Sequence, residues 1–271
     1  GSFDSSFGAN GTLDLRNYIS GWNSSVNKIL VQDDGKILLG GASNYYFGNP
    51  QFTLFRLLSN GAADASFGKV MAGYVYENFH GTTNNYCTAL ALQPDGKIVA
   101  GGNNYSSHGT QSWCFMRFNK NGNLDKNFNS SGKLLLDSLV EGPVKSMAVG
   151  SNGKIVAAGW ATYYHNTTLY YNLGTILQLK DNGKVDNSFG LDGVVSDSMA
   201  LGFTGMAIDA DGNIVVGGNS FFNGTTVMLA ARYRTNLSLN MSKDAVAYSK
   251  TNASAANITT PLVYPNPIQS N

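Results

Sequence analysis

The sequence contains little charge. Asp, Glu, Lys and Arg together form 13% of its 271 residues, about half of the roughly 25% that is typical of soluble proteins, and the formal net charge is +1. Proteins that bind nucleic acid usually carry a basic surface, so nucleic acid is excluded as a partner. No apolar run approaches the roughly 20 residues of a transmembrane helix, so no membrane span is predicted.

Residues that build catalytic or metal sites are also scarce. The three histidines, His80, His108 and His165, lack a metal-ligand spacing, and no phosphate loop, Ser-His-Asp arrangement or Glu pair stands out. The sequence therefore indicates no metal or cofactor. Cys87 and Cys114 are expected on strands separated by a third strand, about twice the roughly 4.8 Å strand spacing apart, which favours buried thiols over a disulfide.

Glycine and aromatic residues are abundant. The chain has 32 glycines, its aromatic content is 11% and its hydrophobic content is 42%. Glycine adopts positive φ in turns at little cost, so we expect many short strands joined by tight turns. This composition predicts an all-β protein and excludes both a helical bundle and a disordered chain.

Two motifs recur with a period of about 60 residues. The first contains a turn glycine, at Gly35, Gly96, Gly153 and Gly212, with spacings of 61, 57 and 59 residues. Its copies are VNKILVQDDGKILLGG from Val26, CTALALQPDGKIVAGG from Cys87, VKSMAVGSNGKIVAAG from Val144 and FTGMAIDADGNIVVGG from Phe203. The second motif occurs as FDSSFG from Phe3, ADASFG from Ala63, LDKNFN from Leu124 and VDNSFG from Val185. Two independent markers with one period establish a repeat protein.

Each repeat is predicted to form four antiparallel strands. An alternating strand leads through a two-residue turn, such as Asp95-Gly96, into a second strand, and a variable loop leads to an apolar third strand. The fourth strand carries the Asp-x-Ser-Phe-Gly motif. Four-stranded sheets that repeat with short connections predict a β-propeller of four blades.

The order of the strands suggests how the ring closes. The chain opens with a motif-bearing strand at residues 2–15, whereas no such motif follows the third strand of the fourth repeat. We therefore expect the N-terminal strand to complete the last blade, which would remove two open sheet edges. The alternative is an open four-blade arc that dimerises into an eight-bladed ring.

The periodic pattern sets the domain boundaries. The propeller is predicted to cover residues 1–240. Residues 241–260 are rich in Ala, Ser, Thr and Asn without periodicity and are interpreted as a linker. Residues 261–271, PLVYPNPIQSN, contain a proline cluster that cannot continue a propeller strand, so they are interpreted as a separate C-terminal element.

The repeat unit resembles the delta-60 repeat family of bacterial β-propellers over residues 2–240. Both motifs occur in the order and period of that family, with local departures such as Asn129 for glycine and Gln178 for the recurrent arginine of the third strands. The resemblance implies a propeller fold, and it implies no activity and no catalytic residues.

The segment LVYPNP at residues 262–267 is similar to the opening strand of the C-terminal sorting domain used by the type IX secretion system of Bacteroidetes. Residues 261–271 would then be the truncated start of such a domain. This resemblance implies contact with the secretion machinery, export across the outer membrane, and a secreted or cell-surface location.

Charged residues recur within the repeat. One interpretation is a ring of charges that binds an anion, and the other is an Arg–Asp pair that holds the strands of each blade together. The pair is favoured, because each repeat must bury its face against its neighbours and a feature of every blade usually stabilises the blade. The residues are Arg56, Arg117 and Arg232 on the third strands, and Asp4, Asp64, Asp125 and Asp186 in the second motif.

Aromatic residues gather in the loops between the second and third strands, which are expected on one face of the propeller. Loops on a rigid scaffold often carry binding residues, and Tyr and Trp offer a flat apolar surface with a polar tip. The alternative is that these rings fold back over the blade edges. Trp113 belongs to the same group of loop aromatics. The candidate ligand-binding residues are Tyr45, Tyr46, Tyr105, His108, Trp160, Tyr163, Tyr164, His165, Phe221 and Phe222.

These patterns favour an exported, non-catalytic binding or adhesion module for a glycan, a peptide or a protein ligand. The alternative is a secreted glycan-active enzyme, either a lyase or a hydrolase. Such an enzyme needs carboxylates or a Tyr or His base that converge on a pocket, whereas most of the 17 acidic residues lie in turns or in the repeated motif. A purely structural spacer is the third interpretation, which buried aromatic loops would favour.

Overall fold

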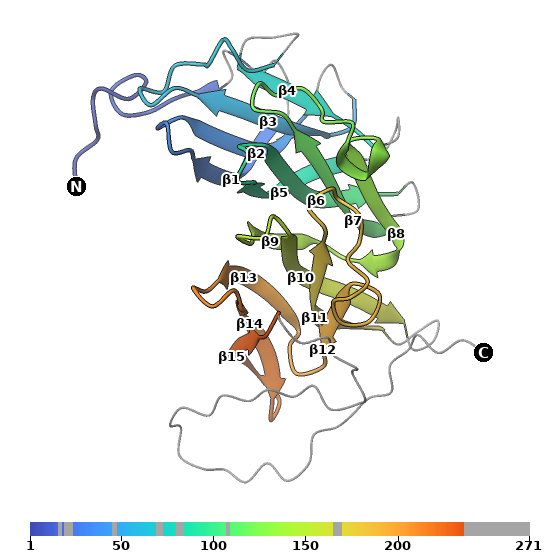
Figure 1. Ribbon diagram of the computed structural model, residues 1–271. Helices are drawn as coiled ribbons and strands as arrows, with labels where there is room; N and C mark the ends of the chain where they lie inside the picture. The colour runs from blue at the N-terminus through green and yellow to red at the C-terminus, as the bar shows by residue number, and fades with distance from the viewer. Residues whose placement is uncertain are drawn as a thin grey trace.

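The computed structural model describes residues 1–15, 18, 24–44, 48–68, 73–79, 84–106, 109–164 and 170–235. Within these ranges the chain is almost entirely β and forms four antiparallel sheets (Figure 1). The expected all-β class is therefore confirmed. The predicted linker at 241–260 and the C-terminal element at 261–271 lie outside the described residues.

The strands follow one another through the sheets in chain order. The first sheet contains β1 (Ser24–Val31), β2 (Ile37–Ser43), β3 (Gln51–Leu57) and β4 (Tyr74–Glu77). The second contains β5 (Asn84–Leu92), β6 (Ile98–Tyr105), β7 (Gln111–Phe118) and β8 (Lys133–Glu141), with a one-turn helix, η2 (Phe128–Ser130), before β8. The third contains β9 (Val144–Val149), β10 (Ile155–Tyr164), β11 (Tyr170–Leu179) and β12 (Val194–Asp197). The fourth contains β13 (Gly202–Ile208), β14 (Ile214–Phe222) and β15 (Thr225–Tyr233).

The predicted turns join the first and second strands of every sheet. All four turn glycines have φ between 76° and 81°, a conformation that L side chains rarely adopt. In the second sheet the Asp95 carboxylate accepts a hydrogen bond of 3.0 Å from the Lys97 backbone N–H, which is the local contact that favours Asp in turns. The Asp-Gly and Asn-Gly pairs therefore set where each hairpin reverses.

Each first strand also contains a β-bulge, and a glycine of the second strand faces it. In the second sheet the pairing register shifts between Cys87 and Ala89. A Cβ atom on Gly102 would lie 1.8 Å from the Tyr86 carbonyl oxygen. The equivalent atoms on Gly41, Gly159 and Gly218 would lie 1.7, 2.1 and 2.0 Å from a carbonyl oxygen. The glycine at the second position of each Gly-Gly or Ala-Gly pair is thus required, because two backbones approach closely there.

The four sheets pack side by side as an arc, with β1, β5, β9 and β13 along its inner side (Figure 1). Apolar side chains fill the space between consecutive sheets. Between the second and third sheets, Trp113 and Phe115 of β7 pack with Val144 of β9 and Leu177 of β11, and all four side chains are fully buried. The core is therefore divided among the sheet interfaces.

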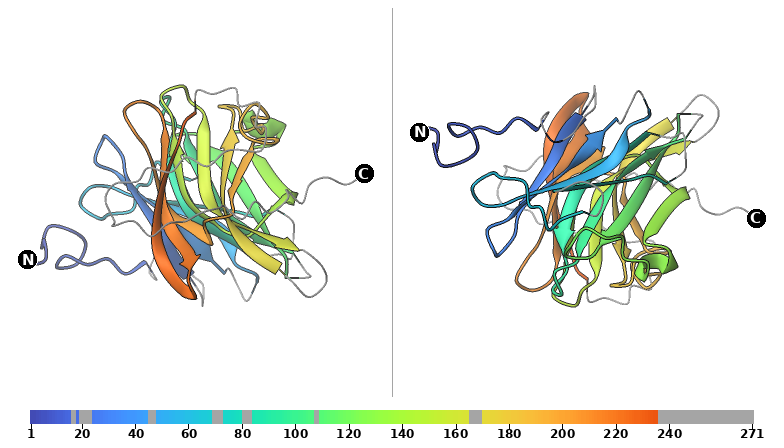
Figure 2. Two further views of the ribbon diagram at one scale, coloured as in Figure 1. Left: turned by 90° about the horizontal axis from the view of Figure 1, so that it is seen from below. Right: turned by 90° about the horizontal axis from the view of Figure 1, so that it is seen from above.

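The predicted closure of the ring by the N-terminal strand is not what the structure shows. Within the described residues β15 pairs only with β14, so the fourth sheet has three strands. The N-terminal segment lies on the first sheet instead (Figure 2), where the Gly8 N–H donates to the Asn60 carbonyl at 2.9 Å. The equivalent bond joins the Gly68 N–H to the Asn121 carbonyl of the next sheet. The N-terminal motif thus contacts the first sheet in the same way as the motif of the first repeat contacts the second sheet.

The close contact at the β-bulge predicts how the methyl group of an alanine at position 102 would change stability. The Gly102→Ala substitution should lower the free energy of unfolding by about 2–4 kcal/mol, because its Cβ cannot avoid the Tyr86 carbonyl without moving backbone. Gly205→Ala is the matched control, since its Cβ meets nothing within 4 Å, and should change stability by less than about 0.5 kcal/mol. Urea unfolding measures both. Equal effects of the two substitutions would contradict this account of the Gly-Gly pair.

Candidate functional site

The recurrent arginine and aspartate pair with each other inside the first two sheets. Arg56 Nε donates to Asp64 Oδ2 at 2.8 Å, and both side chains are almost fully buried. The guanidinium carbon of Arg56 lies 4.5 Å from the centroid of the Phe67 ring. Arg56 Nη1 also donates to the Lys120 carbonyl of the second sheet. We call this arrangement, which links one sheet to the next, the clamp.

The second sheet repeats the clamp. Arg117 Nε donates to Asp125 Oδ2 at 2.9 Å, and the guanidinium lies over the Phe128 ring at 5.1 Å. Arg117 Nη1 donates to the Asp181 carbonyl of the third sheet at 2.5 Å and to the Gln93 side chain at 3.0 Å. These arginines are committed to protein partners, which supports the structural interpretation over a ring of charges that binds an anion.

Hydrogen bonds hold the clamp aspartate in its charged form. Burial acts to raise the pKa of Asp64, but hydrogen bonds from the Ser66 hydroxyl and backbone N–H and the charge of Arg56 outweigh it and lower the pKa to about 2. The carboxylate therefore stays ionised at neutral pH and is engaged on both oxygen atoms.

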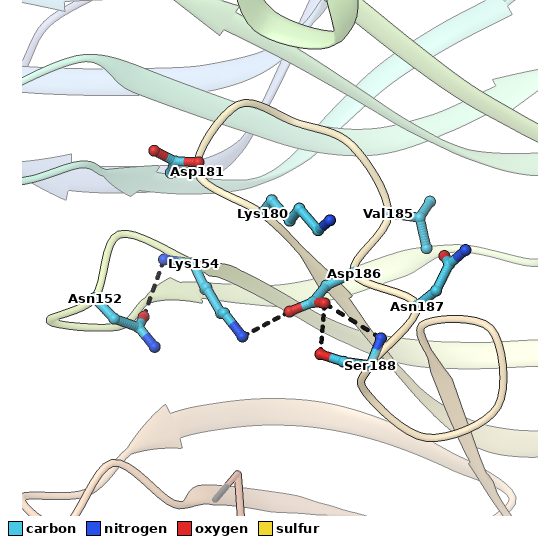
Figure 3. A pocket seen from close by; sticks show the side chains of 8 residues that line it. All are labelled: Asn152, Lys154, Lys180, Asp181, Val185, Asp186, Asn187 and Ser188. Atoms are coloured by element: carbon cyan, nitrogen blue, oxygen red, sulfur yellow. Dashed lines mark hydrogen bonds and ion pairs between the residues drawn. The ribbon is translucent and has the colours of Figure 1, made fainter. Parts of the chain in front are cut away.

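A pocket of about 590 Å³ lies at the corresponding position of the third sheet (Figure 3). Gln178 stands there instead of arginine. Lys154 Nζ lies 2.7 Å from Asp186 Oδ2, closer than the equivalent lysines Lys36 and Lys97 lie to Asp64 and Asp125, at 3.5 and 3.8 Å. Burial acts to raise the pKa of Asp186, but hydrogen bonds from Lys154 and Ser188 lower it. This pocket was not predicted from the sequence, although Gln178, which departs from the recurrent arginine, was the signal for it. The pocket is lined by Asn152, Lys154, Lys180, Asp181, Val185, Asp186, Asn187 and Ser188.

Several candidate aromatic residues share one end of the sheets. Tyr105, Tyr163 and Phe222 lie at or next to the last residue of β6, β10 and β14, which run in the same direction in successive sheets. We call Tyr105, Tyr163, Phe221 and Phe222 the aromatic edge. The candidates Tyr45, Tyr46, His108 and His165 lie outside the described residues, and of Tyr164 only the backbone position at the end of β10 is described.

Both tyrosines of the aromatic edge have fixed hydroxyl groups. The Tyr105 hydroxyl accepts a hydrogen bond of 2.6 Å from Gln111 Nε2, and the ring meets Tyr86 edge to face at 5.7 Å between centroids. The Tyr163 hydroxyl lies 2.6 Å from Ser196 Oγ. Tyr86 was not among the predicted site residues, although it lies near the start of the first strand of its repeat. These contacts orient two half-buried rings.

Phe221 and Phe222 form the most exposed part of the aromatic edge, with 60% and 42% of their surfaces exposed. They precede the turn residues Asn223 and Gly224, which have φ of 47° and 80°. Two positive φ values in succession are typical of a type I′ turn, which forms a rigid two-residue hairpin. The hairpin of β14 and β15 thus holds two apolar rings in solvent.

Trp160 lies apart from the aromatic edge. It belongs to the middle of β10 and is half-buried against the start of β13, where a Cβ on Gly202 would touch its ring at 3.1 Å. Lys145 Nζ lies 4.8 Å from the centroid of a Trp160 ring. The expectation that Trp113 is a loop aromatic is wrong, because Trp113 lies within β7 and is fully buried, with Nε1 donating to the Trp160 carbonyl at 3.3 Å.

Other possible sites are weaker. Cys87 and Cys114 are buried thiols on either side of Gly102 rather than a disulfide, and burial raises the pKa of the Cys87 thiol. In the described ranges no group of three or more His, Cys, Asp or Glu residues could hold a metal ion. The same ranges contain no helix with the length and apolarity needed to cross a membrane.

Comparison with protein families identifies the repeat. Residues 32–67, 93–128, 150–189 and 210–242, together more than half of the chain, match the family model described as "Domain of unknown function (DUF5122) beta-propeller". The predicted β-propeller repeat is thereby confirmed. No curated protein matches the chain.

Solved structures show only distant likeness. A protein of unknown function from Dyadobacter fermentans has a TM-score of 0.47 and 11% identity, with 79% of this chain and 68% of that chain covered. The Bacillus subtilis arabinanase Arb43A has a TM-score of 0.42 and 14% identity, with 80% and 76% covered. A GH43 endo-arabinanase from Bacillus licheniformis has a TM-score of 0.37 and 13% identity, with 82% and 78% covered. At these values the likenesses carry no argument about ligand or activity.

The clamp predicts a specific acid sensitivity. Because the pKa of Asp64 is about 2 in the folded protein, below its ordinary value of 3.8, its contribution to stability is present above about pH 4 and is lost as the pH falls towards 2. Asp64→Asn should lower the free energy of unfolding at pH 7 by about 3 kcal/mol, since Arg56 loses its charged partner, and should reduce the acid-induced loss.

The control for this prediction is Asp33→Asn, a substitution at an exposed position of a turn. It should change neither the stability at pH 7 nor the loss of stability between pH 4 and pH 2. Thermal unfolding followed over that range measures both variants. An unchanged acid-induced loss in Asp64→Asn would show that the clamp carboxylate is not the group that titrates.

Proposed function

We propose that this chain, which belongs to the DUF5122 β-propeller family, is an exported binding module without catalysis that holds a glycan on its aromatic edge. One observation carries the proposal: three successive sheets end their second strands in aromatic rings that keep part of their surface in solvent. Phe221 and Phe222 place two adjacent apolar rings in solvent, and an exposed apolar patch often marks a binding surface.

The geometry of the aromatic edge suits sugar rings. Aromatic rings stack on the C–H faces of sugars through their flat apolar surface, and hydroxyl groups fix the orientation. Tyr105 and Tyr163 are held by Gln111 and Ser196, so little conformational freedom is lost on binding. The same polar side chains lie beside the rings and offer donors and acceptors to sugar hydroxyls. A peptide is the alternative ligand for the same surface.

The carboxylates near this end of the sheets support binding rather than hydrolysis. Glu77 Oε2 accepts a hydrogen bond of 2.8 Å from Lys133 Nζ, and Asp197 Oδ2 accepts one of 2.5 Å from the Tyr233 hydroxyl. A glycosidase needs two carboxyl groups that face each other across a substrate, one of them protonated. Glu77 and Asp197 are instead each engaged by a different partner.

Export forms the second part of the proposal. The LVYPNP segment at residues 262–267 supports recognition by type IX secretion machinery, and the delta-60 resemblance supports a bacterial source. A secreted or cell-surface location would place the aromatic edge in contact with extracellular polysaccharide. Low charge on the chain is compatible with close approach to such a neutral ligand.

A glycan array tests the proposal. The wild-type protein should bind one class of glycan, and Phe221→Ala/Phe222→Ala and Tyr105→Ala/Tyr163→Ala should each weaken that binding about 30-fold, as expected when central aromatic contacts are truncated. Leu191→Ala is the control, because Leu191 is an exposed apolar residue at the opposite end of the sheets. Thermal unfolding confirms that each variant is folded.

Two results would contradict this function. Absence of binding to every glycan would exclude the glycan proposal, and equal binding by the wild type and both aromatic variants would exclude the aromatic edge. Release of reducing ends from a bound glycan would identify an enzyme instead. Glycan binding and release of reducing ends can both be measured with the same purified protein.

A further inference from the structure

On the face of the first sheet that points away from the second sheet, Leu39 and Phe55 pack against the N-terminal segment, whereas the residues of β1 are exposed. Val26 and Ile29 of β1 are 46% and 59% exposed. The residues equivalent to Val26 in the other three sheets, Cys87, Val144 and Phe203, are fully buried. Each of these three packs against the sheet that precedes it in the chain. The first sheet therefore leaves the apolar residues of β1 exposed, whereas a preceding sheet covers the equivalent strand in each of the other three sheets.

The fourth sheet presents the complementary face. Met228 of β15 is 95% exposed, and a Cβ on Gly217 would meet nothing within 4 Å. At the equivalent Gly40 of the first sheet, a Cβ would lie 2.7 Å from Cys87 Sγ and 3.1 Å from the Leu90 side chain of the second sheet. The fourth sheet thus exposes the face that, in each of the first three sheets, is covered by the following sheet.

A second polar contact accompanies the clamp between consecutive sheets. Asn27 Nδ2, from the bulge of β1, donates to the Cys87 carbonyl of β5 at 3.0 Å. Thr88 Oγ1, from the bulge of β5, donates to the Val144 carbonyl of β9 at 2.6 Å. In the fourth sheet the equivalent Thr204 donates instead to the Gly217 carbonyl of its own sheet, at 3.3 Å.

The N-terminal motif holds one half of a clamp. Ser6 donates to Asp4 Oδ1 from its backbone N–H at 2.9 Å and from its hydroxyl at 2.6 Å, as Ser66 does to Asp64. Phe7 lies at the Gly61 turn of the first sheet. In the described part of the chain no arginine reaches Asp4, which is exposed.

The other half of a clamp lies on β15. The Arg232 side chain is 52% exposed and contacts Asp209 and Asp211 through Nη2 alone, at 2.5 and 3.1 Å. In the first two sheets Nε is the atom that bonds the clamp aspartate. Arg232 has a free Nε and no aspartate from the second motif within the described residues.

We propose that a second copy of this chain docks head to tail, so that the first sheet and N-terminal motif of one copy cover the open face of the fourth sheet of the other. Asp4 would complete the clamp with Arg232, and Arg232 would reach the Ser59 carbonyl as Arg56 reaches that of Lys120. Thr204 would turn to the Val26 carbonyl, and Gly217 would pack against Val26 and Ile29.

The structure favours a second copy over closure within one chain. The first and fourth sheets lie at opposite ends of the arc (Figure 1). The occupant must also carry both a motif aspartate and a bare first strand of this repeat, which the head of another copy supplies. Two such contacts close a ring if the rotation permits, and otherwise copies add in a row.

Charge reversal in trans tests the proposal. Light scattering after size exclusion should show that the wild-type 271-residue chain self-associates, whereas Asp4→Arg and Arg232→Asp each raise the dissociation constant about 30-fold or more. An equimolar mixture of the two variants should restore association, because the reversed pair and the original pair then form together. Both positions are exposed, and circular dichroism and thermal unfolding confirm that each variant is folded.

Closure within one chain predicts different results. All proteins would then be monomers, the two variants would unfold at lower temperature, and only the double variant Asp4→Arg/Arg232→Asp, not the mixture, would recover. A monomeric wild type at about 100 µM overturns the proposal, and so does association that neither variant weakens.

Gly217→Leu tests the packing half of the contact independently. The Cβ of residue 217 has open space in one copy, so the variant should fold with an unchanged melting temperature when monomeric. In the docked pair the larger side chain would collide with Val26 and Ile29, so association should fall at least tenfold. Leu191→Ala, at an exposed apolar residue before β12 of the third sheet, serves as the control. Undiminished association of Gly217→Leu would exclude this face.

Discussion

The clamp is the interaction on which the rest of the structure depends. Arg56 bonds an aspartate of its own sheet and a carbonyl of the next sheet, so its buried charge is satisfied only when both sheets are in place. Each sheet likewise buries its apolar face only against a neighbour. The protein is therefore stabilised by contacts between nearest neighbours along the chain. In the third sheet, where Gln178 has replaced arginine, Lys154 pairs with Asp186 within the sheet.

The same packing explains where a ligand can bind. The sheets are held together along the middle of their strands, where glycines and small side chains allow close approach. The ends of the second strands extend beyond this packed region and carry Tyr105, Tyr163, Phe221 and Phe222. Local hydrogen bonds and a tight hairpin turn then fix the rings. A rigid repeat thus presents side chains that differ from sheet to sheet, which allows recognition without altering the scaffold.

Much of the fold could be predicted from the sequence, because the recurring motifs mark where each strand and turn lies in every repeat. The Asp95-Gly96 type of turn, the Gly-Gly pair and the motif phenylalanines each have one physical role, and that role is the same in every sheet. The candidate site was harder to predict. Trp113 and Trp160 both follow a variable loop or glycine pair in the sequence, yet one is fully buried and the other packs on β13. Tyr86 and the pocket at Asp186 gave only weak signals.

The sequence by itself determined the repeat, the strands and turns within it, and the chemical types of side chain available at the end of each second strand, because these follow from local periodicity and backbone preference. Only the tertiary structure decided which aromatic rings are exposed and how the ends of the arc are arranged. Those properties depend on the angle and contact between whole sheets. The N-terminal motif shows the difference: its residues predict a clamp, but the contact of Gly8 with Asn60 holds it on the first sheet and leaves Arg232 on the fourth without it.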